Sequence, residues 1–233
     1  MLFPDDCRVC GRALEGWTRV PVCDACLQCP QPLRAEFFCR LCQTPFVNAF
    51  PLDADGVCTV CRSGLRGFEG AYCVAAYEGA FRKLIHVYKY ERVQALRAPL
   101  SQMLATALPR DASFDVVTCV PLHWTRRYRR GFNQSALLAL DIARRWGVPY
   151  ASTLRRRRPT PSQAGLTDAR RRMNVSGAFR LRPRAAVRGQ RVLLVDDVMT
   201  TGATAHACAA ALRRGGARSV VLLTLARVDR RLG

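Results

Sequence analysis

The sequence predicts an α/β protein in which a mainly parallel sheet is flanked by helices and preceded by a small cysteine-rich module. Predicted strands and helices alternate from residue 69 to the C-terminus, which is typical of parallel sheets. Residues 192–204 have the pattern of a strand, a glycine-containing turn and the start of a helix. Ten of the twelve cysteines lie in the first 73 residues. We therefore expect a metal-binding module over residues 1–68 and an α/β domain over residues 69–233.

Composition limits the class of protein. A chain of 233 residues that is 49% hydrophobic can form one good core and a small appended module. It has no apolar run of 18 or more residues, and its N-terminus lacks the pattern of a signal peptide, so we expect a cytoplasmic protein without a membrane span. The net charge is +20, with 37 basic residues against 17 acidic ones. Such a surface favours nucleic acid or phosphate-rich small molecules as partners, the alternative being a solvated charged surface without a dedicated partner.

The cysteine-rich head contains four Cys-x-x-Cys pairs, each of which forms a tight knuckle that can bring two thiolates to one ion. Twelve residues separate the first two pairs and fifteen separate the last two, which suits two structural zinc ions, or one. A disulfide framework would need an oxidising compartment, and a redox Cys-x-x-Cys site is normally single and next to a βαβ unit. The predicted ligands are Cys7, Cys10, Cys23, Cys26, Cys39, Cys42, Cys58 and Cys61.

Four cysteines lie outside these pairs. Cys29 follows Cys26 closely enough to be an alternative zinc ligand, and Cys73 has no assigned role. Cys119 lies in an apolar strand and Cys208 in an alanine-rich helix, which indicates buried, inert thiols.

After the head, apolar periodicity predicts alternating elements. Strands are expected over residues 71–77 and 115–121 and near Tyr150, and helices over residues 79–90, 95–108 and 131–146.

Two arginine-rich segments interrupt this pattern. The first directly follows a predicted strand, and its arginines are candidates for binding a diphosphate or DNA: Arg126, Arg127, Arg129 and Arg130. Trp124, Tyr128 and Phe132 are interleaved with them as possible stacking platforms for single-stranded DNA, or as core residues. The second, residues 155–175, is either a mobile loop that closes over a phosphorylated ligand or a soluble linker.

Residues 192–204 carry the clearest chemical signal. Ligands of parallel sheets bind beyond the carboxyl ends of the strands, where Asp196 and Asp197 are expected. Free N–H groups at a helix N-terminus, with threonine hydroxyls beside them, suit a phosphate, and a glycine lets the backbone approach it. The acids suit hydroxyl groups or a divalent cation. The alternative without a binding site is a buried strand followed by an ordinary capped helix. The residues of the turn are Thr200, Thr201, Gly202, Ala203 and Thr204.

This run resembles the signature with which type I phosphoribosyltransferases bind phosphoribosyl diphosphate. The order of further motifs is similar to that of the ComF family: Cys-x-x-Cys pairs, Lys89-Tyr90, Val-Pro-Leu-His, Arg-Gly-Phe-Asn-Gln, Arg-x-Thr-x-x-Gln, Arg-x-Asn-Val and then the signature. The resemblance implies a phosphoribosyltransferase-like domain behind zinc ribbons. It also implies that Asp196 and Asp197 hold the ribose of a Mg²⁺-bound phosphoribosyl diphosphate and that residues 200–204 hold the 5′-phosphate. Members of the competence branch assist DNA uptake alongside a helicase.

Three functions are compatible with these features. The first is binding of phosphoribosyl diphosphate, or a related nucleotide, in a protein that contacts single-stranded DNA and a competence helicase. The second is an active phosphoribosyltransferase, in which arginines and Mg²⁺ would stabilise the leaving diphosphate. The third is a structural zinc-ribbon adaptor. The sequence identifies neither a catalytic residue nor the acceptor.

Overall fold

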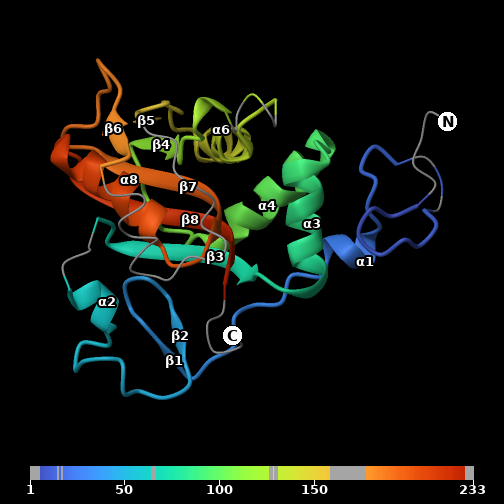
Figure 1. The fold of residues 1–233 in the computed structure, drawn as a ribbon, viewed down its shortest axis with the longest axis horizontal. Coiled ribbons are helices and arrows are strands. Elements are labelled where there is room, and N and C mark those ends of the chain that lie inside the picture. Colours follow the sequence, from blue (N-terminus) through green and yellow to red (C-terminus); the bar gives the residue numbers. More distant parts are fainter. Residues whose placement is uncertain are drawn as a thin grey trace.

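The structure is a computed structural model that describes residues 6–14, 16, 18–63, 67–125, 128, 131–157 and 177–228. Its centre is a four-stranded sheet in the order β3 (Gly70–Ala76), β8 (Ser219–Arg227), β7 (Arg191–Met199) and β4 (Val116–Cys119) (Figure 1). All three neighbouring pairs are parallel, as predicted. The strand expected near Tyr150 is a single parallel bridge between Val117 and Tyr150 at the β4 edge.

Helices cover both faces of this sheet. One face carries α3 (Gly79–Tyr90), α4 (Arg97–Ala107, after the 3-10 turn Gln94–Leu96) and α6 (Gln134–Trp146). The other carries α8 (Ala203–Arg214) and the antiparallel pair β5 (Leu154–Arg156) and β6 (Phe179–Leu181) (Figure 1). Side chains alternate between the two faces: Leu193 lies in the core with α3, α4 and α6, while Leu194 lies in the core with α8. The predicted α/β layering is therefore confirmed.

Several predicted boundaries shift for local reasons. Helix α6 starts at Gln134 rather than 131 because the Asn133 side chain accepts a hydrogen bond from the Ser135 N–H (3.2 Å), which caps the helix there. The segment predicted as a loop from residue 155 begins inside β5 instead, and its residues 158–175 lie outside the described residues. Strand β7 continues through both acids to Met199, because Asp196 is in register with Thr224 and Met199 with Arg227.

The cysteine-rich head forms two modules that share a local design. In the first cysteine module, built on Cys7, Cys10, Cys23 and Cys26, the second pair opens the short helix α1 (Asp24–Leu27). In the second cysteine module, built on Cys39, Cys42, Cys58 and Cys61, it opens α2 (Thr59–Arg62). Each module begins with an antiparallel pairing around its first knuckle: a bridge between Asp6 and Ala13, and strands β1 (Phe37–Phe38) and β2 (Pro45–Phe46).

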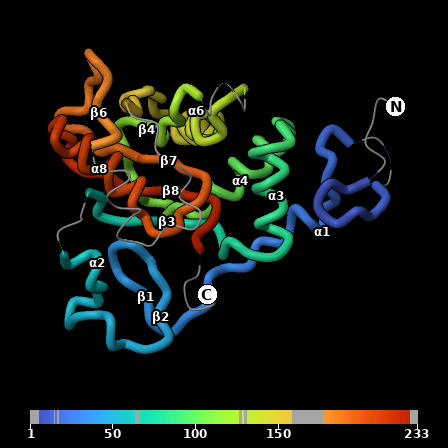
Figure 2. Tube along the Cα trace, viewed as in Figure 1, coloured from blue at the N-terminus to red at the C-terminus, as the bar shows by residue number. Residues whose placement is uncertain are grey.

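The two modules lie apart in space (Figures 1 and 2). The first lies beside α3, and its Cys26 joins the core formed with that helix. The second lies near β3 and α8, and Cys61 joins the core on that face. No helix in the described part of the chain is long and apolar enough to cross a membrane.

Candidate functional site

A cavity of 370 Å³ opens where the carboxyl ends of β4 and β7 meet the start of α8. Strands of a parallel sheet end together at this edge, so their last residues converge on one space. Asp196, Asp197 and most of the predicted turn line it: Thr200, Gly202, Ala203 and Thr204. Thr201 lines a different cavity, on the side of the second cysteine module.

Asp197 is buried and held by two side chains from other elements. Its exposed fraction is 8%, and its Oδ1 lies 2.8 Å from Nζ of Lys89 in the last turn of α3. Its Oδ2 accepts a hydrogen bond of 2.6 Å from Nε2 of Gln134, the first residue of α6. Burial alone would lower the pKa of Lys89, but the adjacent Asp197 carboxylate outweighs it and the pKa is raised. Lys89 and Asp197 therefore form a buried ion pair between α3 and β7, and Gln134 connects the pair to α6.

Asp196 has a different environment. Its Oδ1 accepts hydrogen bonds from Oγ of Ser135 (3.1 Å) and from the Asp197 N–H (2.9 Å). Burial raises the pKa of Asp196 to about 7, and the neighbouring Asp197 charge adds to this, while Lys89 and the Ser135 hydroxyl oppose it. A cation or hydroxyl groups bound beside Asp196 would favour its ionised form and lower this pKa.

Gln134 is almost fully buried, with an exposed fraction of 1%, and lines the cavity. Its Nε2 is used by Asp197, whereas its Oε1 is buried without a hydrogen-bond partner among the described residues. An unsatisfied buried acceptor is costly, so this oxygen is a candidate acceptor for a donor from outside the described residues.

The backbone of the turn favours a glycine at Gly202. Its φ is +78°, in the left-handed region that favours glycine. A Cβ at this position would lie 2.8 Å from Cε of Met199, the flexible end of a side chain that could shift to make room. Thr201 Oγ1 accepts a hydrogen bond from the Ala203 N–H (3.2 Å), so the hydroxyl fixes the start of α8. The helix N-terminus then faces the cavity, where it favours an anion.

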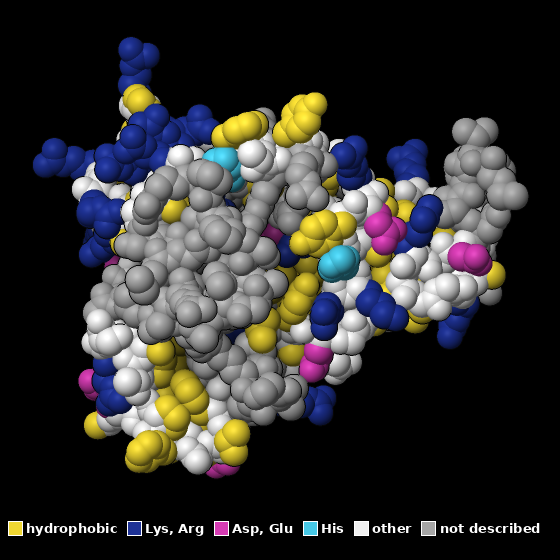
Figure 3. Space-filling model, viewed as in Figure 1, with side chains coloured by type: hydrophobic (Ala, Val, Ile, Leu, Met, Phe, Trp, Pro, Cys, Tyr) yellow, Lys and Arg dark blue, Asp and Glu magenta, His cyan; other side chains and the backbone are white. Residues whose placement is uncertain are grey.

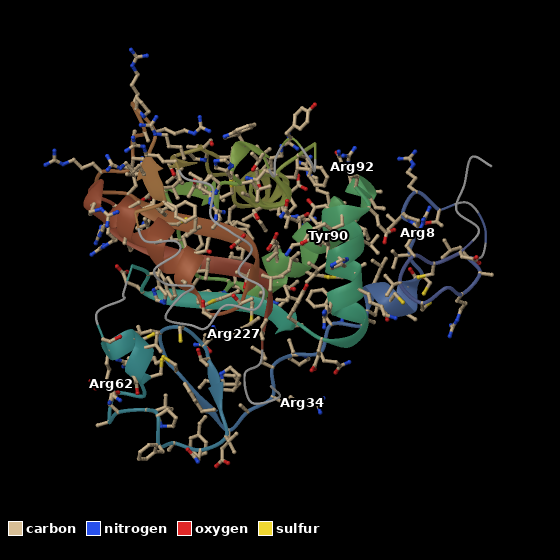
Figure 4. The ribbon with its side chains drawn as sticks, viewed as in Figure 1. Arg8, Arg34, Arg62, Tyr90, Arg92 and Arg227 are labelled. Atoms are coloured by element: carbon tan, nitrogen blue, oxygen red, sulfur yellow. The ribbon has the colours of Figure 1, made fainter. Side chains whose placement is uncertain are left out.

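Two of the polar residues that line this cavity were assigned no role from sequence alone. Lys89 and Gln134 stood within motifs, Lys89-Tyr90 and Arg-Gly-Phe-Asn-Gln, but neither could be connected to Asp197 without the fold. Arg156 of β5 also lines the cavity, with its guanidinium carbon 5.4 Å from the ring centre of Phe179. Tyr90, at the end of α3 in Figure 4, lines it as well. The diphosphate candidates of the first arginine-rich segment lie outside the described residues: Arg126, Arg127, Arg129 and Arg130.

The aromatics of that segment fall into two groups. Trp124 and Tyr128 are exposed, with exposed fractions of 72% and 86%. Phe132 packs against the core, with its ring 5.9 Å from that of Tyr88, which matches the core alternative for this residue.

The cysteine modules fit a tetrahedral metal. In each, the four sulfur atoms lie within 4.8 Å of one another, and the described residues yield the two predicted sets of four. Sγ of Cys10 lies 3.8 Å from Sγ of Cys23, and Sγ of Cys42 lies 3.8 Å from Sγ of Cys58. A tetrahedral zinc ion with bonds of about 2.3 Å to sulfur requires edges of about 3.8 Å. Both modules could therefore hold structural zinc, and Cys29 belongs to neither set.

The thiol of Cys208 is fully buried, and this burial raises its pKa well above the usual range. It is therefore an unreactive core residue, in agreement with the sequence-based interpretation.

Arg227 connects the second cysteine module to the site. It ends β8 beside Met199, its exposed fraction is 4%, and it points toward that module (Figure 4). Its guanidinium donates hydrogen bonds to the Cys42 carbonyl and to Thr44 Oγ1, and contacts Sδ of Met199 at 3.3 Å. Because Cε of Met199 lies where it would come within 2.8 Å of a Cβ at Gly202, Arg227 and Met199 link the second cysteine module to the turn.

Comparisons with known proteins agree with this arrangement. The phosphoribosyl transferase domain family matches residues 133–232, which include β7, the turn and α8. The DNA utilization protein YhgH of Salmonella typhi is 31% identical over 227 residues, covering 81% of this chain and 96% of the relative. Competence protein F of Haemophilus influenzae is 33% identical over 153 residues, covering 62% of this chain and 66% of the relative.

Among solved structures, the glutamine phosphoribosylpyrophosphate amidotransferase from B. subtilis is 29% identical. That match covers 56% of this chain and 26% of the other, with a TM-score of 0.40.

Proposed function

The chain belongs to the ComF family, and from the geometry of its cavity we propose that it binds phosphoribosyl diphosphate, or a closely related nucleotide, together with Mg²⁺. One observation carries the proposal. Two adjacent carboxylates at the end of a parallel strand and an anion-binding turn line the same 370 Å³ cavity. Phosphoribosyl diphosphate has the matching groups: ribose hydroxyls next to a 5′-phosphate, with the diphosphate beyond the hydroxyls.

The proposed roles follow from the chemistry of each group. Carboxylates accept hydrogen bonds, so Asp196 and Asp197 receive the ribose hydroxyls. Residues 200–204 receive the 5′-phosphate, through N–H groups at the start of α8 and through threonine hydroxyls. Oε1 of Gln134, which has no partner among the described residues, accepts from a ligand hydroxyl. Mg²⁺, when bound, neutralises the diphosphate charge.

Two groups of cations are proposed for the diphosphate. In the described part, Arg156 lines the cavity, and Lys89 lies on its wall while paired with Asp197. The arginines after β4 remain candidates for the diphosphate or for DNA: Arg126, Arg127, Arg129 and Arg130. Arginine suits this role because its fork matches two phosphate oxygens at once.

We further propose that this site works in DNA utilisation during natural transformation, with single-stranded DNA and a competence helicase as partners. The names of the relatives, DNA utilization protein and competence protein, support this. The net charge of +20 supports a polyanionic partner.

Titration calorimetry with phosphoribosyl diphosphate and Mg²⁺ tests the site. We expect Asp196→Asn to weaken binding by about 10- to 100-fold, the value of a charge-assisted hydrogen bond. Asp111→Asn, at an exposed acid away from the cavity, is the matched control and should bind as the wild type does. Binding that is absent, or equal in both variants, would contradict the proposal. Diphosphate release in the same mixture, on addition of candidate acceptors, would identify the protein as a transferase.

A further inference from the structure

A second cationic surface lies away from the cavity. Exposed arginines gather on β5 and β6, on the segment that follows β6 and around the C-terminal end of α8. In Figure 3 the dark-blue side chains crowd this corner of the molecule, at the upper left. The exposed arginines of these segments are Arg155, Arg157, Arg180, Arg182, Arg184, Arg188, Arg213, Arg214 and Arg218.

The β5–β6 pair places like charges directly opposite each other. Arg155 is the cross-strand partner of Arg180, and both are exposed. Their neighbours Leu154 and Leu181, also cross-strand partners, belong to the core cluster shared with α8, so the arginines occupy the outer face. Like charges opposite one another destabilise a sheet pair. A bound anion between them would reverse this effect.

Acidic side chains do little to neutralise the surface. Among the described residues, the nearby ion pairs join Glu69 to Arg213 at 3.3 Å and Asp115 to Arg191 at 2.7 Å. No acid in the described part of the chain forms an ion pair with either arginine of the cross-strand pair.

The surface is hollowed as well as charged. A groove of 560 Å³ runs between β6 and the end of α8, and four arginines line it: Arg155, Arg180, Arg182 and Arg214. Four guanidinium groups around one groove match successive phosphates of a strand better than a single small anion.

Exposed aromatics come from the adjacent edge of the sheet. The segment leading into β5 runs beside β4: Val117 bridges to Tyr150, and Oγ1 of Thr118 lies 2.8 Å from Oγ1 of Thr153. Trp124 and Tyr128, both exposed, follow β4 in the chain. Exposed aromatic side chains can stack on unpaired bases, which a closed duplex does not offer.

We propose that the outer face of β5–β6 and the adjoining groove bind the phosphate backbone of single-stranded nucleic acid. This inference rests on the proposed role in DNA utilisation and gives that role a surface separate from the phosphoribosyl cavity. The contacts are to phosphates, so binding is independent of sequence and weakens as salt rises.

The test uses the full chain, a fluorescent oligothymidylate of about 20 nucleotides and salt between about 50 and 200 mM. The variant Arg155→Gln plus Arg180→Gln removes the cross-strand pair. Arg19→Gln plus Arg40→Gln removes the same charge from exposed positions in the two cysteine modules and is the control. We expect the first variant to bind about tenfold more weakly, with the salt slope reduced by about 1.4, while the control binds as the wild type does.

Three further readouts keep the outcomes apart. The melting temperature of the first variant should be equal to or above that of the wild type, because a repulsive pair is removed. Equal loss in both variants, or tighter binding of a duplex of the same length, would overturn this surface alone. No binding by the wild type would overturn the DNA role with it. Unchanged binding of Mg²⁺–phosphoribosyl diphosphate in the first variant shows that the cavity is independent.

Discussion

The two cysteine modules have the same internal geometry but different surroundings. Each has two knuckles, a Sγ–Sγ distance of 3.8 Å and a short helix that opens after its third cysteine. In the second module all four cysteines are buried, whereas in the first Cys10 is exposed and Cys23 is half-buried. Both units therefore pack against a core, but the cysteines of the first are partly exposed and those of the second are all buried.

What each module supports differs accordingly. The first packs beside α3, the helix that carries Lys89, and adds an exposed ion pair of 3.9 Å between Arg8 and Glu91. The second reaches the ends of β7 and β8 through Arg227 and so touches the residues that shape the turn. Two cysteine quartets of the same geometry therefore pack against different elements, one against the helix that carries Lys89 and the other, through Arg227, against the ends of β7 and β8.

The largest difference between the two modules should appear when one cysteine ligand is removed from each in turn. We expect Cys61→Ser to lose the second zinc ion, to lower the melting temperature and to weaken Mg²⁺–phosphoribosyl diphosphate binding at least tenfold. The physical reason is that structural zinc supplies folding energy that such a small module cannot replace. Cys10→Ser should also lose one zinc ion but retain most of the binding. Zinc content, thermal melting and calorimetry measure this, and equal binding losses would contradict the asymmetry.

Arg227 is the next test, because it bridges the second module and the turn. Arg227→Met should destabilise the protein by about 2–4 kcal/mol, since it leaves the Cys42 carbonyl and the Thr44 hydroxyl without their charged donor. Urea unfolding gives this value, and Arg40→Met, at an exposed arginine of the same module, is the control. An equal free energy of unfolding for the two variants would show that the hydrogen bonds of Arg227 do not stabilise the protein.

The pH dependence of stability and of ligand affinity should report on the Asp196 carboxylate rather than on the cysteine modules. Because burial raises the pKa of Asp196 to about 7 from 3.8, the folded state holds a proton that the unfolded chain has lost between these values. The contribution of Asp196 to stability therefore falls as pH rises through this window. Ligand binding needs the carboxylate, so affinity should rise about tenfold from pH 6 to pH 8. Calorimetry on zinc-loaded protein measures it, and Asp196→Asn should abolish the slope. A slope that persists in this variant would assign the effect to other groups.

The smallest expected effect lies in the knuckles themselves. Gly11 of the first module has φ +74°, and Gln43 at the matching position of the second has φ +56°. A non-glycine residue in this region is strained, so Gln43→Gly should stabilise the second module by about 1 kcal/mol. Gly11→Gln should destabilise the first by a similar amount. Thermal melting resolves both, and a destabilised Gln43→Gly variant or a stabilised Gly11→Gln variant would show that the modules are not equivalent inside.

Local patterns predicted much of this molecule. The strand, turn and helix around Gly202 were evident because apolar runs, glycine and hydroxyl residues fix them over a few positions. The cysteine quartets were evident because their spacing matches one tetrahedral ion. Helix boundaries moved by only a few residues, as caps such as Asn133 decided them.

Contacts between distant parts of the chain could not be predicted. Gln134 and Asp197 are 63 positions apart, and Arg227 lies 185 positions from Cys42. Nothing local in the sequence says which buried cation pairs with which acid, because this depends on how α3 and α6 pack on the sheet. The separate placement of the two modules and the cross-strand arginines of β5–β6 depend on tertiary packing in the same way.

The most direct test of the phosphoribosyl site is a crystal structure of the zinc-loaded protein grown with Mg²⁺ and phosphoribosyl diphosphate. We expect density for the 5′-phosphate at residues 200–204, with the ribose hydroxyls on Asp196 and Asp197 and one of them donating to Gln134. Ligand density elsewhere, or a cavity without ligand at concentrations that saturate binding in solution, would contradict it.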